Sequence, residues 1–133
     1  MLVVDSSVWI DYFNGAASSA RGTLRRLLAG GETEIIVPDL VLYEVLRGFR
    51  DERQYLQAQQ LLLTLTVQST GGQALALRAA AHFRSLRAAG ITVRSAIDVL
   101  LAAFCIERGY TLLHADRNFD AFASLRGLQA WRH

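Results

Sequence analysis

The sequence predicts a single α/β domain in which helices cover both faces of a five-stranded, mainly parallel sheet. Short runs of aliphatic residues alternate along the chain with longer segments of helical periodicity. Strands that alternate with helices usually pair in parallel and are buried on both faces. The chain has 133 residues, 52% of them apolar, which suits one hydrophobic core and leaves no room for a second domain. One domain over residues 1–133 is therefore expected.

The first half of the chain contains three of the expected strands. Runs of Leu, Val and Ile predict strands over residues 2–5, 34–37 and 65–68. Apolar residues at helical spacing predict helices over residues 6–14, 18–29, 38–47 and 51–63. Ser6 and Ser7 are expected to cap the first of these helices, and Gly48 to end the third.

The second half contains the two longest helical patterns and the last two strands. An amphipathic helix is expected over residues 72–89, and a strongly apolar helix over residues 95–108. Gly109 ends the second helix. A strand over residues 111–114, a turn or short helix over 118–123, and a strand over 128–131 complete the pattern.

Composition excludes several classes of phosphate-handling protein. All 14 basic residues are arginines, whereas P-loop NTPases and phosphoacceptor signalling domains both need a lysine beside the phosphate. The segment DSSVW after the first expected strand also lacks the D-x-D-x-T pattern of haloacid-dehalogenase-type phosphatases. The single cysteine, Cys105, has no partner for an intramolecular disulfide and is expected to be a small buried hydrophobe.

Charge and hydropathy bear on location and partners. The longest apolar run, residues 99–106, is far shorter than the ~20 residues of a membrane span, and no leader pattern opens the chain, so we expect a cytoplasmic protein. The net charge is +2. If the four acids described next gather in one pocket, the rest of the chain has 14 arginines and 8 acidic residues, a balance of +6. This balance suits a polyanionic partner, although the coding bias of a GC-rich genome also explains arginine without lysine.

The four acids are Asp5, Glu44, Asp98 and Asp116. An ionised carboxylate in apolar surroundings loses hydration and needs a partner, a proton or a metal ion. The chain offers arginine or a bound cation for this purpose, and we favour the cation. Asp5 and Asp116 fall at the carboxyl ends of the first and fourth expected strands, where parallel sheets collect ligands. We expect all four carboxylates to meet at this edge.

Each acid also has an interpretation that leaves it outside any site. Asp98 fits a capping box with Ser95, Asp5 can cap the first helix, Asp116 can form an Asx-turn, and Glu44 can pair with Arg47. Taken singly, each of these is the simpler explanation. Capping does not, however, explain why all four acids accompany elements that point toward one edge of the sheet, so the joint pattern favours a site.

Four sequence segments resemble the PIN-domain family, and in particular the VapC-type toxins of bacterial type II toxin–antitoxin systems. They are VVDSSVWIDYF, PDLVLYEVLRG, DVLLAAFCIERG and LLHADRNFD, in this order and over nearly the whole chain. The resemblance implies a three-layer α/β/α sandwich and an endoribonuclease that depends on Mg²⁺ or Mn²⁺. It also implies a homodimer and a small antitoxin partner that inhibits the enzyme. A non-catalytic binding module and a nuclease that cuts DNA remain the alternatives.

The resemblance carries residue roles with it. The acidic site falls on Asp5, Glu44, Asp98 and Asp116, with Ser7 in support and Asp120 able to share or take the role of Asp116. Mg²⁺ prefers oxygen ligands and retains waters, so we expect Asp5 and Asp98 as principal ligands and the other two acids as secondary ones or as a base. Candidate RNA contacts are Arg47, Arg50, Arg94 and Arg117.

Overall fold

The computed structural model describes residues 1–133 and contains one sheet of five parallel strands. The strands are β1 (Leu2–Val4), β2 (Ile35–Pro38), β3 (Thr66–Gln68), β4 (Thr111–Leu113) and β5 (Gln129–Ala130). Their order across the sheet is β3-β2-β1-β4-β5. The predicted α/β class with five strands is confirmed, and the pairing is parallel throughout.

Helices connect every pair of consecutive strands. They are α1 (Ser6–Asn14), α2 (Ser19–Gly30), α3 (Asp39–Leu46), α4 (Glu52–Leu63), α5 (Gly72–Ala88), α6 (Ala96–Arg108), the 3₁₀ turn η1 (Arg117–Phe119) and α7 (Asp120–Arg126). Each expected helix is present with ends within a few residues of the prediction. None of the helices is long and apolar enough to cross a bilayer.

One local prediction is wrong, and it concerns the start of α1. Ser6 and Ser7 do not cap this helix, because Asp5 occupies the N-cap position with extended backbone (φ −62°, ψ 147°). The carbonyl of Asp5 accepts the amides of Val8 and Trp9, so the helix begins at Ser6 as predicted, and Asp5, the alternative cap, holds the N-cap position without a side-chain capping bond. Both serine hydroxyls are consequently free to bond to carboxylates at the sheet edge.

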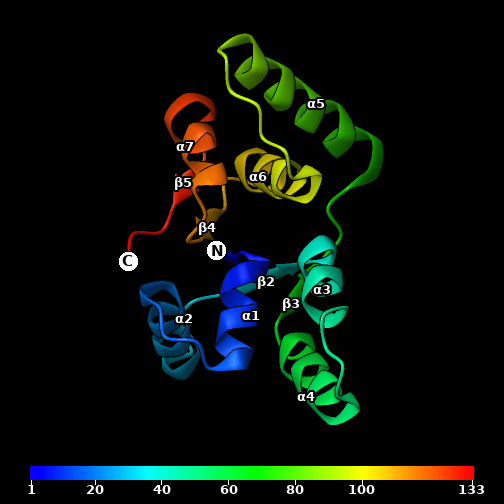
Figure 1. The fold of residues 1–133 in the computed structure, drawn as a ribbon, viewed down its shortest axis with the longest axis vertical. Helices are drawn as coiled ribbons and strands as arrows, with labels where there is room; N and C mark the ends of the chain where they lie inside the picture. Colours follow the sequence, from blue (N-terminus) through cyan, green and yellow to red (C-terminus); the bar gives the residue numbers. More distant parts are fainter.

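The helices form layers on either side of the sheet. Figure 1 shows α1, α2 and α4 on one side and α5, α6 and α7 on the other, with α3 packed against α1 and α4. From β1 the chain proceeds outward to β2 and β3, then returns to place β4 on the opposite flank of β1. The strand order therefore reverses between β1 and β4, which makes their carboxyl ends the expected ligand position.

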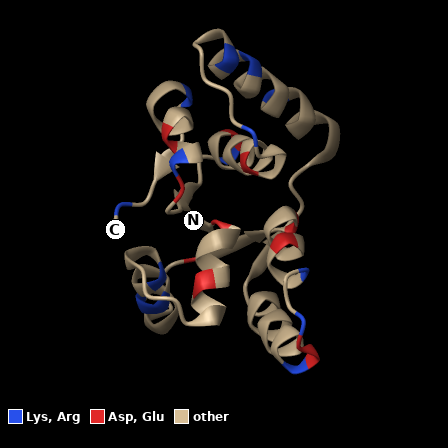
Figure 2. Ribbon diagram, viewed as in Figure 1, with Lys and Arg blue, Asp and Glu red and all other residues tan.

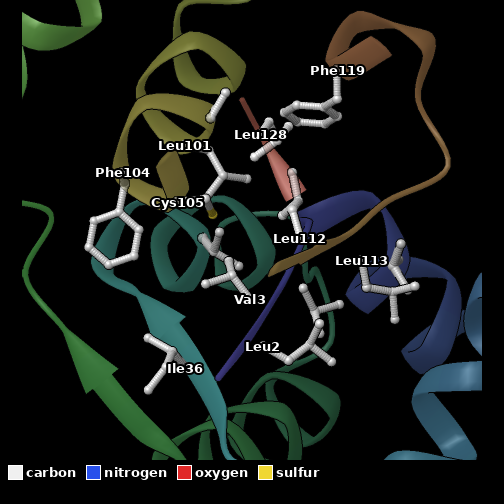
Figure 3. Close-up of a cluster of buried hydrophobic side chains, with 14 of the residues drawn as sticks. Leu2, Val3, Ile36, Leu101, Phe104, Cys105, Leu112, Leu113, Phe119 and Leu128 are labelled. Carbon is white, nitrogen blue, oxygen red and sulfur yellow. The ribbon is translucent and has the colours of Figure 1, made fainter. Parts of the chain in front are cut away.

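The core fills the space between the sheet and the helices. All residues of β1 and β2 are buried, and α6 buries Leu101 through Cys105 against the sheet (Figure 3). Phe104 and Leu112 are among the fully buried side chains. Cys105 is completely buried in this cluster, as predicted, and Trp9 likewise lies in the core rather than on the surface.

Candidate active site

Asp5 lies at the reversal point of the sheet. It directly follows β1, and its amide donates to the carbonyl of Leu113 at the end of β4 (2.9 Å), which continues the Val4–Leu113 pairing by one residue. The side chain is almost completely buried, with 3% exposed. The hydroxyl of Ser7 donates to Asp5 Oδ2, as expected for the supporting residue. Strand pairing thus fixes the first candidate carboxylate at the carboxyl edge.

Glu44 reaches the same edge from α3. Val41 and Val45 are buried and fix the inner face of the helix, which leaves Glu44 half-buried beside the start of α1. There its carboxylate accepts a hydrogen bond from the hydroxyl of Ser6. The alternative pairing with Arg47 is wrong, because the Arg47 guanidinium lies over the ring of Tyr43, 5.5 Å from its centroid, and forms no ion pair.

Asp98 and Asp116 are joined through Asn118. The hydroxyl of Ser95 accepts the Asp98 amide (3.3 Å), so the capping interpretation is correct for the backbone of this turn. The Asp98 side chain points elsewhere, since its Oδ2 accepts from Asn118 Nδ2 (3.2 Å). The backbone amide of Asn118 in turn donates to Asp116 Oδ1 (2.9 Å), which is the Asx-turn considered above. The turns at Asp98 and Asp116 are therefore capped as the simpler interpretation predicts, and Asn118 also links the two side chains.

Burial and the charges of the other acids both raise the pKa values of Asp5 and Asp98. Burial raises the pKa of Asp5 to about 6, against the opposing hydrogen bond from Ser7, and the charges of Asp98 and Glu44 raise it further. Burial likewise raises the pKa of Asp98, with additional contributions from Asp116 and Glu44. No arginine offsets these charges, because the only ion pairs in the protein join Glu107 to Arg78 and to His82.

The donor set suits a hard divalent cation. No three His, Cys, Asp or Glu side chains are arranged closely enough to hold one ion directly between them. Mg²⁺ does not require such a cage, because one or two carboxylates and several waters commonly complete its shell. The pKa values of Asp5 and Asp98 are raised mainly by burial and further by neighbouring carboxylates, and a hydrated cation would favour their ionised forms.

Asp116 is better placed than Asp120 to act with the other acids. The charge from this segment that raises the pKa of Asp98 is that of Asp116. Asp120 begins α7, is exposed, and acts instead on the neighbouring His114, where it opposes the lowering of the pKa that burial causes. We therefore retain Asp116 as the fourth acid.

Two residues of the site were missed in the sequence. Ser6 and Asn118 both hydrogen-bond to candidate carboxylates. Ser6 was interpreted as a helix cap, and only its tertiary contact with α3 reveals its role. The Asx-turn expected at Asp116 predicts only the bond to the backbone amide of Asn118, whereas the bond from its side chain to Asp98 is a tertiary contact with no local signal. The candidate RNA contacts are all exposed and unpaired, and they remain predictions: Arg47, Arg50, Arg94 and Arg117.

The four carboxylates occupy an open edge rather than an enclosed cavity. The hollow of about 590 Å³ between α5 and α6 is lined mainly by apolar residues such as Ala79, Phe83 and Val99, and by none of the four acids. The other pronounced hollows are also lined by other residues. Small-molecule sites are usually concave and largely apolar. Carboxylates that are buried or half-buried at an open edge of the sheet are better suited to a large substrate than to a small molecule enclosed in a cavity.

Comparisons with known proteins identify relatives of the whole chain. The family model described as PIN domain matches residues 2–125. Ribonuclease VapC11 of Mycobacterium tuberculosis and a VapC ribonuclease of Mycobacterium bovis are each 35% identical over 131 residues, which is 98% of this chain and 97% of theirs.

Two solved structures share the fold. VapC20 of Mycobacterium tuberculosis, described as a sarcin-ricin-loop-cleaving toxin, is 22% identical, with a TM-score of 0.73 over 100% of both chains. In the VapBC2 complex of Rickettsia felis, bound to a DNA fragment from its promoter, the matching chain is 18% identical, with a TM-score of 0.72 over 98% of each chain.

Proposed function

The chain belongs to the PIN domain family, and on that premise we propose that it is a metal-dependent endoribonuclease that acts as the toxin of a toxin–antitoxin pair. One observation carries this proposal. Four carboxylates from separate elements interact at the point where the strand order reverses, and no basic side chain neutralises them. Relatives of full length that are named ribonucleases support RNA over DNA as the substrate.

Each carboxylate has a distinct part in the proposed reaction. Asp5 and Asp98 would be the principal ligands for Mg²⁺ or Mn²⁺, because both are buried or half-buried and both have raised pKa values. Glu44 and Asp116 would act on a bound cation through water, and one of them would orient the attacking water as a base. When bound, the cation supplies an activated water and neutralises charge that develops on the phosphate.

Neighbouring polar side chains hold the carboxylates in place. Ser7 fixes one oxygen of Asp5, Ser6 fixes one oxygen of Glu44, and Asn118 fixes Asp98. Each of these bonds uses one acceptor position and leaves the other oxygen for a cation or a water. Such supporting bonds to metal ligands commonly contribute 10–100-fold to metal affinity or activity.

The proposal extends to partners. VapBC complexes from Rickettsia felis and Salmonella typhimurium have the same fold over nearly their whole chains, which supports an antitoxin as a partner of this protein. We further propose that the active form is a homodimer and that it acts on RNA in the cytoplasm. The exposed arginines near the acids, Arg47, Arg50, Arg94 and Arg117, would contact phosphates beside the one that is cleaved.

Cleavage of RNA by the purified protein tests the proposal. Total cellular RNA is incubated with the protein and Mg²⁺ or Mn²⁺, with EDTA in a parallel reaction. Asp98→Asn is compared with Glu32→Gln, which makes the same change from carboxylate to amide at an exposed position. We expect cleavage that requires the metal, disappears in Asp98→Asn and persists in Glu32→Gln.

The contrary results are equally clear. Activity that survives both EDTA and Asp98→Asn would refute the assignment of the site. A folded wild-type protein that binds Mn²⁺ and RNA without cutting any fraction of cellular RNA or of DNA would favour the non-catalytic binding module. Cleavage of DNA in preference to RNA would replace the substrate but keep the site.

A further inference from the structure

A surface rich in arginine lies beside the acidic site but belongs to a different part of the chain. Helix α2 has three arginines and no acidic residue in its sequence SARGTLRRLLAG. Arg26 donates to the hydroxyl of Thr23 (3.2 Å), whereas Arg25 is exposed and has no partner. Figure 2 shows basic positions along α2 and near the C-terminal end of the chain. Arg132 in that tail is also exposed and unpaired.

The C-terminal tail connects α2 to the acidic edge. The ring of His133 bonds through Nδ1 to the hydroxyl of Ser19, the first residue of α2, and through Nε2 to the carbonyl of His114 (2.8 Å). His114 directly follows β4 and precedes Asp116 by two residues. The start of α2 and the tail that carries Arg132 are therefore held next to the strand end from which the fourth acid comes.

Two arginines of this surface lie on one face of α2. Arg21 and Arg25 are four residues apart and lie on the same face of α2. The Nε of Arg21 is buried without any acceptor. A bound phosphate would not reach this buried atom, so Arg21 would contact an anion through its terminal guanidinium nitrogens.

We propose that Arg21, Arg25 and Arg132, together called the α2–tail surface, bind backbone phosphates of the RNA on one side of the cleaved bond. This inference rests on the proposed function. The four carboxylates repel a polyanion, and a nearby basic surface supplies the attraction that brings the strand to them. The α2–tail surface lies on the side of α2 and β4, whereas Arg47 and Arg50 flank α3, so the two groups hold different stretches of the strand.

Salt dependence of RNA binding distinguishes this surface from general positive charge. Binding is measured by fluorescence anisotropy with a short labelled single-stranded RNA, in EDTA and in the Asp98→Asn background, over a series of salt concentrations. The test variant is Arg25→Gln with Arg132→Gln. The control is Arg53→Gln with Arg84→Gln, which removes the same charge from exposed, unpaired positions on α4 and α5.

The expected effect follows from counterion release. Each phosphate contact on single-stranded nucleic acid contributes about 0.7 to the slope of log K against log salt concentration, so the test variant should lose about 1.4. Between 1 M and 0.1 M salt, that slope difference corresponds to roughly 25-fold weaker binding at the lower concentration. The slope of the control variant should stay within about 0.3 of the slope measured for the Asp98→Asn protein that retains all its arginines.

Two results would overturn the inference. Equal loss in both variants would mean that the arginines act only through net charge. Unchanged RNA binding together with loss of binding to polyglutamate would assign the surface to an acidic protein. Neither result bears on cleavage, which is measured separately with all arginines present. A protein that binds RNA through this surface but never cuts it would contradict only the proposed function.

Discussion

Replacing Asp5 by asparagine should stabilise the metal-free protein. The pKa of Asp5 rises from 3.8 to about 6 on folding, because burial and the nearby carboxylates disfavour its charged form. At 1.36 kcal/mol per pKa unit, keeping Asp5 ionised in the fold costs about 3 kcal/mol. The amide of asparagine carries no charge but leaves an N–H to satisfy, at a cost of about 1 kcal/mol. The net gain at pH 8 should be about 2 kcal/mol.

The effect has a defined pH dependence. Because the folded pKa lies above the unfolded one, the folded protein binds the proton more tightly, and this contribution to stability is lost as the pH rises from about 4 through about 6. Asp5→Asn should therefore be about 1 kcal/mol less stable than wild type at pH 4, where only the cost of the amide N–H remains, and about 2 kcal/mol more stable at pH 8. Asp98, whose pKa is also raised, is present in both proteins and cancels in the comparison.

Urea unfolding in EDTA at the two pH values measures this difference. A gain of about 2 kcal/mol corresponds to a rise in Tm of roughly 8 °C for a domain of this size, so thermal unfolding provides an independent check. A variant that is less stable than wild type at pH 8, or whose advantage is the same at pH 4, would refute the reasoning. Such a result would mean that Asp5 is neutralised in the fold by a group other than a cation.

Other expectations follow from the same contacts. Mg²⁺ at ten times its Kd should stabilise the wild-type protein by about 1.4 kcal/mol in thermal unfolding, and a similar gain in Asp98→Asn would contradict the ligand assignment. Asp116→Asn should reduce RNA cleavage far more than Asp120→Asn, and the reverse order would make Asp120 the fourth acid. Asn118→Ala should lower cleavage roughly 10-fold and move the acidic limb of the pH–rate profile upward, since it removes a hydrogen bond that lowers the pKa of Asp98. Leu112→Ala should cost about 2–5 kcal/mol of folding free energy in urea, because its side chain is fully buried, and a cost below about 1 kcal/mol would contradict the described core.

The sequence predicted the elements well because their signals are local. Apolar runs marked β1 and β2, and Gly109, with a φ of +69° that favours glycine, marked the end of α6. The position of Asp5 and Asp116 followed from a general property of parallel sheets, since both come just after strands. What was predicted was therefore set by neighbouring residues or by the fold class.

The remaining features depend on tertiary contacts. The hydroxyl of Ser6 meets Glu44 across 38 residues, and Asn118 meets Asp98 across 20. The strand order that places β4 next to β1 cannot be inferred from the strand sequences, because both are short buried aliphatic runs. The contact of His133 with Ser19 and His114 is likewise invisible in the sequence, although it determines where the α2–tail surface lies.

The central claim is that the acids act as one metal-dependent site, and a double-mutant cycle tests it most directly. Single-turnover RNA cleavage is measured for Asp5→Asn, Asp98→Asn and the double variant at saturating Mg²⁺. If the two carboxylates hold the same cation, either substitution alone removes metal-dependent cleavage. The cleavage rate of the double variant is then no lower than that of the slower single variant. Losses that multiply would mean that Asp5 and Asp98 act independently, which would contradict a shared site.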